Sequence, residues 1–164
     1  LVAAMPAEAG ARAVKATRTL IEGARRLGVP VLVTEQYPRG LGPTVATLRE
    51  VLDGVTALEK LEFDATANDG FDAALRETKR SHVVLAGMES HICVYQTARG
   101  LVRRGVRVHV AEDATCSRTA ENAVVGRGLW ARAGAVVSST ETVLFDWVGG
   151  GGTEDFKLVS RLVR

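Results

Sequence analysis

Short apolar runs alternate with amphipathic stretches along the chain. The apolar runs are rich in β-branched residues and predict buried strands at 29–34, 56–60, 81–86, 106–111 and 135–138. Apolar residues at helical spacing predict helices at 7–27, 44–52, 69–78, 90–104, 119–133 and from 139 or 140 to 147. This alternation is typical of a three-layer α/β/α sandwich with a mostly parallel central sheet.

The end of the chain carries four consecutive glycines at 149–152. They predict a flexible hinge before a last helix, which Thr153 caps and which has acidic residues in its first turn. With 164 residues, the chain is long enough for a substantial core, and we expect one domain over 1–164.

Composition narrows the class of protein. Hydrophobic residues make up 46% and charged residues 24%, and the formal net charge is +2. Basic residues are scattered and aromatic residues are few, which argues against nucleic acid as a partner. No apolar run approaches the ~20 residues of a membrane span, and no secretory signal is present. We therefore expect a cytoplasmic protein whose two cysteines, Cys93 and Cys116, stay reduced.

Chemistry-bearing residues follow several of the predicted strands. In parallel sheets, ligands bind beyond the carboxyl ends of the strands. The polar segments after those ends contain Glu35–Tyr37, Lys60, Glu89–Cys93 and Asp113–Arg118. We expect these segments to line one cleft, with Tyr37, Phe63 and Tyr95 as candidate substrate contacts.

Cys93 sits where the strand 81–86 turns, through Gly87, into a helix. One interpretation is a small buried hydrophobic residue, which is the usual role of a lone cysteine. The other is a nucleophile: with Ser90 as the helix cap, Cys93 lies near the third helical position. Free backbone N–H groups there favour a thiolate or an oxyanion.

The residues that accompany Cys93 also have two interpretations each. Lys60 is either a solvated surface lysine or a cation that lowers the thiol pKa. His91 lies two residues from Cys93 and so points to another helix face, which disfavours a Cys–His pair. Asp113–Arg118 either caps a helix or forms a cleft wall or subunit contact, with Cys116 in polar packing. No ligand spacing indicates a metal site.

Taken together, these motifs resemble the isochorismatase-like cysteine hydrolases. The resemblance rests on Gly87–Val94 (GMESHICV), Lys60, Asp113–Arg118 and Pro30–Gly42, and it extends to Thr153–Lys157. Pro30–Gly42 (PVLVTEQYPRGLG) is similar to a run in the isochorismatase domain-containing subgroup.

The resemblance implies an Asp–Lys–Cys triad with Cys93 as nucleophile and Lys60 stabilising charge. It also implies an oxyanion hole from the backbone N–H groups of Glu89, Ser90 and Cys93, with a cis peptide at Glu89–Ser90. No cofactor or metal is implied, since the loop 35–43 lacks the histidine of metal-dependent relatives.

One member of this triad has no match in the sequence. The family's aspartate closes a first strand that precedes the segment matching Leu1–Pro6, and no acid occupies that place. Either the strand precedes the printed sequence, which we favour because its loss would open the core, or the protein itself lacks it.

The sequence thus predicts a metal-independent hydrolase of small amides or ureides, acting as a homo-oligomer. The alternatives are a non-catalytic scaffold of the same fold and, more weakly, a thiol redox protein, since no Cys-x-x-Cys pair is present.

Overall fold

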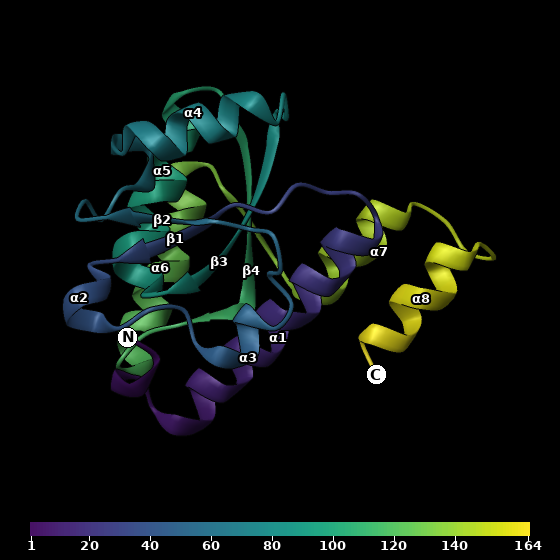
Figure 1. Ribbon diagram of the computed structural model, residues 1–164, viewed down its shortest axis with the longest axis horizontal. Helices are drawn as coiled ribbons and strands as arrows, with labels where there is room; N and C mark the ends of the chain where they lie inside the picture. Colours follow the sequence, from purple (N-terminus) through teal and green to yellow (C-terminus); the bar gives the residue numbers. More distant parts are fainter.

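The computed structural model describes residues 1–164 as parallel strands flanked by helices (Figure 1). The strands are β1 (Val33–Gln36), β2 (Ala57–Lys60), β3 (His82–Met88), β4 (Arg107–Cys116) and β5 (Val136–Ser138). The helices are α1 (Ala7–Arg26), α2 (Pro38–Leu41), α3 (Ala46–Arg49), α4 (Asp69–Glu77), α5 (Tyr95–Arg103), α6 (Ala120–Ala133), α7 (Thr140–Val148) and α8 (Glu154–Leu162). Shorter turns are η1 (Val2–Ala4), η2 (Ala65–Ala67) and η3 (Ser90–Val94). None of the helices has the length and apolar character needed to cross a bilayer.

The strands form two hydrogen-bonded sheets rather than one. β1 pairs with β2, and a second sheet has the order β3-β4-β5, with every pair parallel. The register sets Gln36 opposite Lys60 and Met88 opposite Cys116 at the carboxyl ends. No hydrogen-bonded ladder joins β1 to β3, so the sheet is interrupted between them.

Two core clusters cover the two faces of β4. Val108 and Val110 pack with residues of α5 and α6, including Leu101 and Trp130. Ala111 and Ala114 pack with residues of α1, α7 and α8, including the fully buried Leu144 and Val159. Figure 1 shows α5 and α6 on one side of β3 and β4, and α1 with α7 on the other. This arrangement confirms the predicted three-layer α/β/α class.

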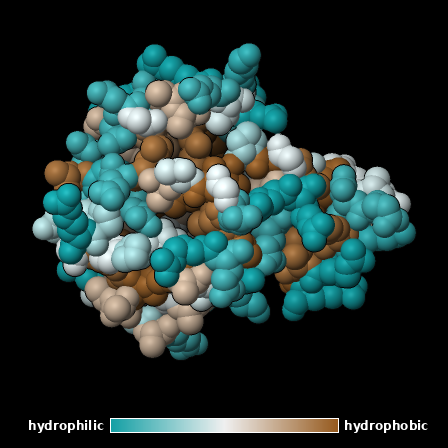
Figure 2. Space-filling view, viewed as in Figure 1, coloured by the Kyte–Doolittle hydropathy of each residue, from teal (hydrophilic) through white to brown (hydrophobic).

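A cleft of about 440 Å³ opens at the interruption in the sheet. Its walls are the segments 29–36 and 82–88, and α1 contributes Leu20, Ile21 and Ala24. Lys60 and Cys93 line the same cleft, next to the carboxyl ends of the strands. Figure 2 shows hydrophobic side chains gathered in a hollow at the middle of this face, surrounded by hydrophilic ones.

Most predicted elements are confirmed, and three differ in extent. β1 begins at Val33 instead of Val29, because pairing with β2 starts only where Val33 meets Ala57. β4 continues through Cys116, beyond a register shift opposite Leu85–Gly87, so Asp113–Cys116 is strand and not loop. The predicted helix 44–52 is reduced to α3, which has Val45 as its cap residue.

Candidate active site

The turn that carries Cys93 joins β3 to α5. Glu89 is its extended cap residue, Ser90–Val94 form one π-helical turn, and α5 continues from Tyr95. Ser90 is therefore the first helical residue and not the predicted cap. The cis peptide lies at Met88–Glu89, one bond before the predicted Glu89–Ser90. A cis bond without proline has no residue signature, which is why the sequence did not place it.

Lys60 ends β2 with its side chain turned into the protein, and the residue is only 6% exposed. Its Nζ donates to Gln36 Oε1 at 2.5 Å, to the Glu62 carbonyl at 2.8 Å and to the Phe63 carbonyl at 3.4 Å. All three acceptors are neutral, and Lys60 forms no salt bridge with a carboxylate. The ammonium is thus solvated by dipoles, and the nearby Glu62 and Asp64 carboxylates act on it only by charge, without a direct ion pair.

Gln36 connects the lysine to the cysteine. Its Oε1 accepts from Lys60 Nζ and also from the Cys93 thiol, at a sulfur–oxygen distance of 3.9 Å. Its Nε2 donates to the Leu61 carbonyl at 2.7 Å, which fixes the amide orientation. Sequence reasoning placed Gln36 in the cleft but gave it no role. Its position at the end of β1, in register with Lys60, was the available signal.

Burial and charge act in opposite directions on the two ionisable groups. Burial raises the pKa of the Cys93 thiol, while the Lys60 charge and backbone hydrogen bonds from Glu89 and Cys93 lower it. Burial also lowers the pKa of Lys60, against the attraction of a Cys93 thiolate and of the Glu62 and Asp64 carboxylates. The net rise for Cys93 corrects the expectation that the helix start makes thiolate the favoured form: desolvation outweighs the backbone groups.

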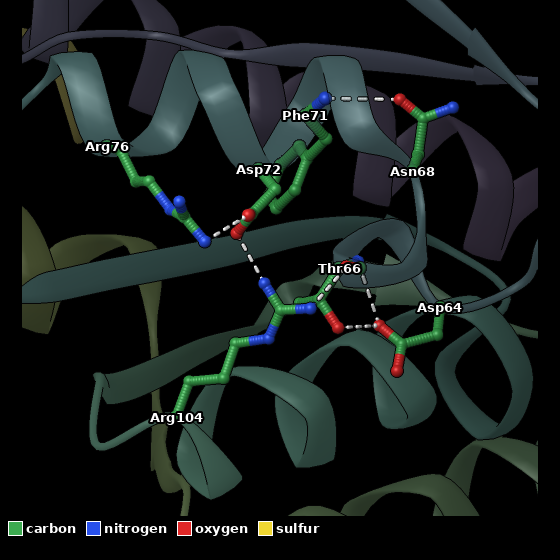
Figure 3. A network of polar contacts seen from close by, with 7 residues as sticks. All are labelled: Asp64, Thr66, Asn68, Phe71, Asp72, Arg76 and Arg104. Carbon is green, nitrogen blue, oxygen red and sulfur yellow. Dashed lines mark hydrogen bonds and ion pairs between the residues drawn. The ribbon is translucent and has the colours of Figure 1, made fainter.

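The loop after β2 is anchored by a polar network around Asp72 and Arg104 (Figure 3). Arg104 pairs with Asp72 and donates to the Thr66 carbonyl at 2.5 Å, and Asp64 caps η2 by accepting from Thr66 N at 2.9 Å. Thr97 of α5 accepts from Ala65 N at 3.0 Å. These bonds hold residues 64–66 in place. The two residues just before them, at positions 62 and 63, supply the carbonyls that accept from the Lys60 ammonium.

The segment Asp113–Arg118 does not line the cleft, which corrects that part of the prediction, and it makes capping and anchoring contacts instead. Asp113 caps α7, its Oδ1 accepting from Thr140 N at 2.8 Å. Arg118 N and Nε both donate to Glu89 Oε2, at 2.9 and 3.1 Å, and so hold the residue that caps the cysteine turn.

The remaining histidine and cysteine near the site have structural contacts. His91 Nδ1 lies 3.0 Å from Ser117 Oγ and does not pair with Cys93. Cys116 is 2% exposed and packs with Met5 and Ala13, so its predicted polar packing is wrong: as a strand residue it faces an apolar cluster. Both cysteines are free thiols.

The three candidate substrate contacts do not line the cleft. Tyr37 and Phe63 are about half exposed, at 49% and 51%. Tyr95 packs against the core, and the Arg99 guanidinium lies 5.1 Å from its ring centre. Their contact with a substrate stays a prediction. The structure holds no cluster of three or more His, Cys, Asp or Glu side chains positioned for a metal ion.

Comparisons with known proteins fit this geometry. The isochorismatase domain model matches residues 2–142. Isochorismatase domain-containing protein 1 of Salmo salar is 37% identical over 147 residues, which cover 88% of this chain and 51% of that protein. The chain thus spans about half the length of the first curated relatives that it matches.

Two solved structures illustrate the range of structural similarity. A structure described as the MAR1 ribonuclease from Caenorhabditis elegans is 36% identical, with a TM-score of 0.88, and the match covers 94% of this chain and 79% of that one. The Escherichia coli YcaC product, described as an octameric hydrolase of unknown specificity, has a TM-score of 0.84 at 18% identity, covering 96% and 78%. The second shows the fold alone. With the domain model matching most of the chain and the parallel α/β arrangement behind it, this chain belongs to the isochorismatase domain family.

Proposed function

We propose that the chain acts as a cysteine hydrolase on a small amide or ureide, with no metal and no cofactor. One observation carries the proposal: Lys60 at the end of β2 and Cys93 in the turn after β3 share the Gln36 Oε1 atom inside one cleft. A buried lysine that is not directly paired with a carboxylate can balance an anion in the cleft. A Cys93 thiolate, or the oxyanion formed after its attack, supplies that anion.

In the proposed reaction, Cys93 Sγ attacks the amide carbon and the carbonyl oxygen becomes an oxyanion. Backbone N–H groups of Glu89, Ser90 and Cys93 are the proposed donors to it. The Ile92 and Val94 N–H groups are already bonded to the Glu89 carbonyl, at 3.1 and 3.2 Å. The C–N bond then breaks as the leaving nitrogen takes a proton, which gives a thioester. Water hydrolyses the thioester to the acid and restores the thiol.

The proton relay requires an acid that the sequence does not contain. We propose that an additional parallel strand fills the cleft between β1 and β3 and ends in the aspartate that the family resemblance implies. The cleft supports this, because two parallel strands face each other across apolar walls without a ladder between them. The strand's carboxyl end would then lie beside Lys60 and Cys93. We expect hydrolysis to need such an aspartate. Changing that aspartate to Asn should therefore abolish turnover.

The direct test is hydrolysis of a panel of small amides and ureides by the full-length protein. Cys93→Ala should abolish both turnover and the covalent adduct that an electrophile forms, as seen by intact mass. Cys116→Ala is the matched control, since that thiol packs away from the cleft. Turnover that persists in Cys93→Ala would overturn the proposal.

Two other functions are outcomes of the same experiment. A non-catalytic scaffold predicts no turnover of any compound, with Cys93 still open to alkylation. If the chain is a redox protein instead, Cys93 should react with peroxide and be recovered by thiols, without hydrolysis.

A short RNA also belongs in the panel of compounds, because the Caenorhabditis elegans neighbour is described as a ribonuclease.

We further propose a cytoplasmic homo-oligomer. Tyr37, Leu41, Leu61 and Phe63 are 40–71% exposed and follow the carboxyl ends of β1 and β2, which is an unusual concentration of apolar side chains on a free surface. Light scattering during gel filtration tests the assembly: a monomer at micromolar concentration would contradict it.

A further inference from the structure

The connection between β4 and α6, together with α6 itself, contacts three consecutive residues of the cysteine turn. Arg118 holds the Glu89 carboxylate, and Ser117 lies against His91. The intervening Ser90 has no exposed surface and is held by α6 through Trp130 and Gly126.

Trp130 supplies a direct hydrogen bond to the turn. Its Nε1 donates to the Ser90 carbonyl at 2.9 Å, and the indole is 1% exposed. The same carbonyl also accepts from Tyr95 N within its own turn, so the Trp130 bond is the one that ties this peptide to α6. The Ser90 hydroxyl itself is buried without a hydrogen-bond partner, which leaves the carbonyl as the anchored group.

Gly126 lies one helical turn before Trp130 and so faces the same way. A Cβ at this position would lie 2.8 Å from the Ser90 carbonyl carbon and 2.9 Å from His91 N. Both are backbone atoms of the turn, so a larger residue displaces the turn rather than a flexible side chain. The close approach of α6 therefore determines how deep the turn sits, and Cys93 lies three residues after Ser90.

We propose that Gly126 and Trp130 are positioning residues that set the location of the Cys93 thiol through the Ser90 peptide. The proposal deepens the proposed function and rests on Cys93 as its nucleophile. Displacing the turn moves the backbone groups of Glu89 and Cys93, which lie beside the sulfur and lower the pKa of the thiol. The effect of changing Gly126 is then a change in thiol ionisation and not only in stability.

The test compares Gly126→Ala with Gly128→Ala, two changes on one helix. Gly128 has open space where its Cβ would be, so it controls for the change in helix propensity. Iodoacetamide alkylation of Cys93 is measured from pH 6 to 10 by peptide mass mapping, which separates Cys93 from Cys116, and circular dichroism monitors folding. We expect Gly126→Ala to raise the pH midpoint by about 0.5 and to slow alkylation at pH 8 by about threefold.

Trp130→Phe is the second variant, because it keeps an aromatic ring and removes only the α6 donor to the Ser90 carbonyl, while the Tyr95 N–H bond stays. We expect a smaller shift in the same direction. The proposal is overturned if Gly126→Ala and Trp130→Phe both titrate like wild type and Gly128→Ala. Should Gly126→Ala not fold, Trp130→Phe decides alone. Because alkylation needs no substrate, a shifted midpoint without amide hydrolysis supports the positioning role and rejects only the proposed function.

Discussion

Replacing Lys60 by Met isolates the electrostatic part of the candidate site. Methionine keeps an unbranched side chain of similar length and removes the charge. Lys60 Nζ and Cys93 Sγ both contact Gln36 Oε1, at 2.5 and 3.9 Å, so the two atoms lie within roughly 6 Å of each other. At an effective dielectric constant of ~20, an ammonium and a thiolate at that distance attract by about 2–3 kcal/mol.

Solvent in the open cleft screens part of this attraction, so we expect loss of the cation to lower the thiolate population roughly 10- to 100-fold. The sign follows from the charges: without the cation the thiolate is less stable, and the pKa of Cys93 rises further above its ordinary value. Alkylation of Cys93 at pH 8 should then slow by roughly 10- to 100-fold, with the pH midpoint moved upward.

The assay is the rate of iodoacetamide alkylation against pH, with peptide mass mapping to follow Cys93. Lys157→Met is the matched control, because that side chain is 56% exposed and pairs with Glu154 on α8. A midpoint in Lys60→Met that coincides with wild type would refute the reasoning. It would mean that water screens the pair completely or that Lys60 is already neutral.

Three further predictions concern the surroundings of the site. Arg118→Ala removes one of two donors to the nearly buried Glu89 carboxylate. Because Arg118 is itself over half exposed, we expect the free energy of unfolding, measured with urea, to fall by about 1 kcal/mol. An unchanged free energy of unfolding would contradict the anchoring role. Gly100→Ala brings a Cβ to 2.6 Å from Asp64 Oδ2 and should cost about 1–3 kcal/mol, whereas Gly128→Ala should not destabilise; equal Tm values for the two variants would disprove the contact. The third prediction is a pH dependence of stability, tested in a Cys93→Ser background. Between the lowered pKa of Lys60 and the ordinary lysine value, the unfolded chain binds more protons than the folded one, so the free energy of unfolding should rise with pH across that window. Lys60→Met should abolish the rise, and parallel curves for the two proteins would contradict the prediction.

Much of the scaffold was predictable because its signals are local. The apolar run before Gly87 predicts a buried strand, and β3 occupies His82–Met88. Thr119, Ser139 and Thr153 accept hydrogen bonds from backbone N–H groups at the starts of α6, α7 and α8, as their positions before helical patterns predict. The carboxyl-end rule for parallel sheets placed Lys60 and Cys93 in one cleft, where the structure has them.

The rest depends on contacts between distant residues. The role of Gln36 depends on the register between β1 and β2, which no local pattern specifies. The cis bond at Met88–Glu89 involves no proline and leaves no mark in the sequence. The balance of effects on the pKa of Cys93 depends on burial of the side chain, and burial is a property of the whole packing.

The interruption between β1 and β3 also has a mechanical consequence. Gln36 and Lys60 belong to one hydrogen-bonded sheet, while Cys93 follows a strand of the other, and no backbone ladder fixes the spacing between them. The distance between the Cys93 thiol and the Lys60 ammonium can therefore change easily, because only side-chain packing across an apolar gap sets it. A segment that fills the gap would set the distance between Lys60 and Cys93. It would thereby set the strength of the charge interaction on which we propose the reactivity of the cysteine depends.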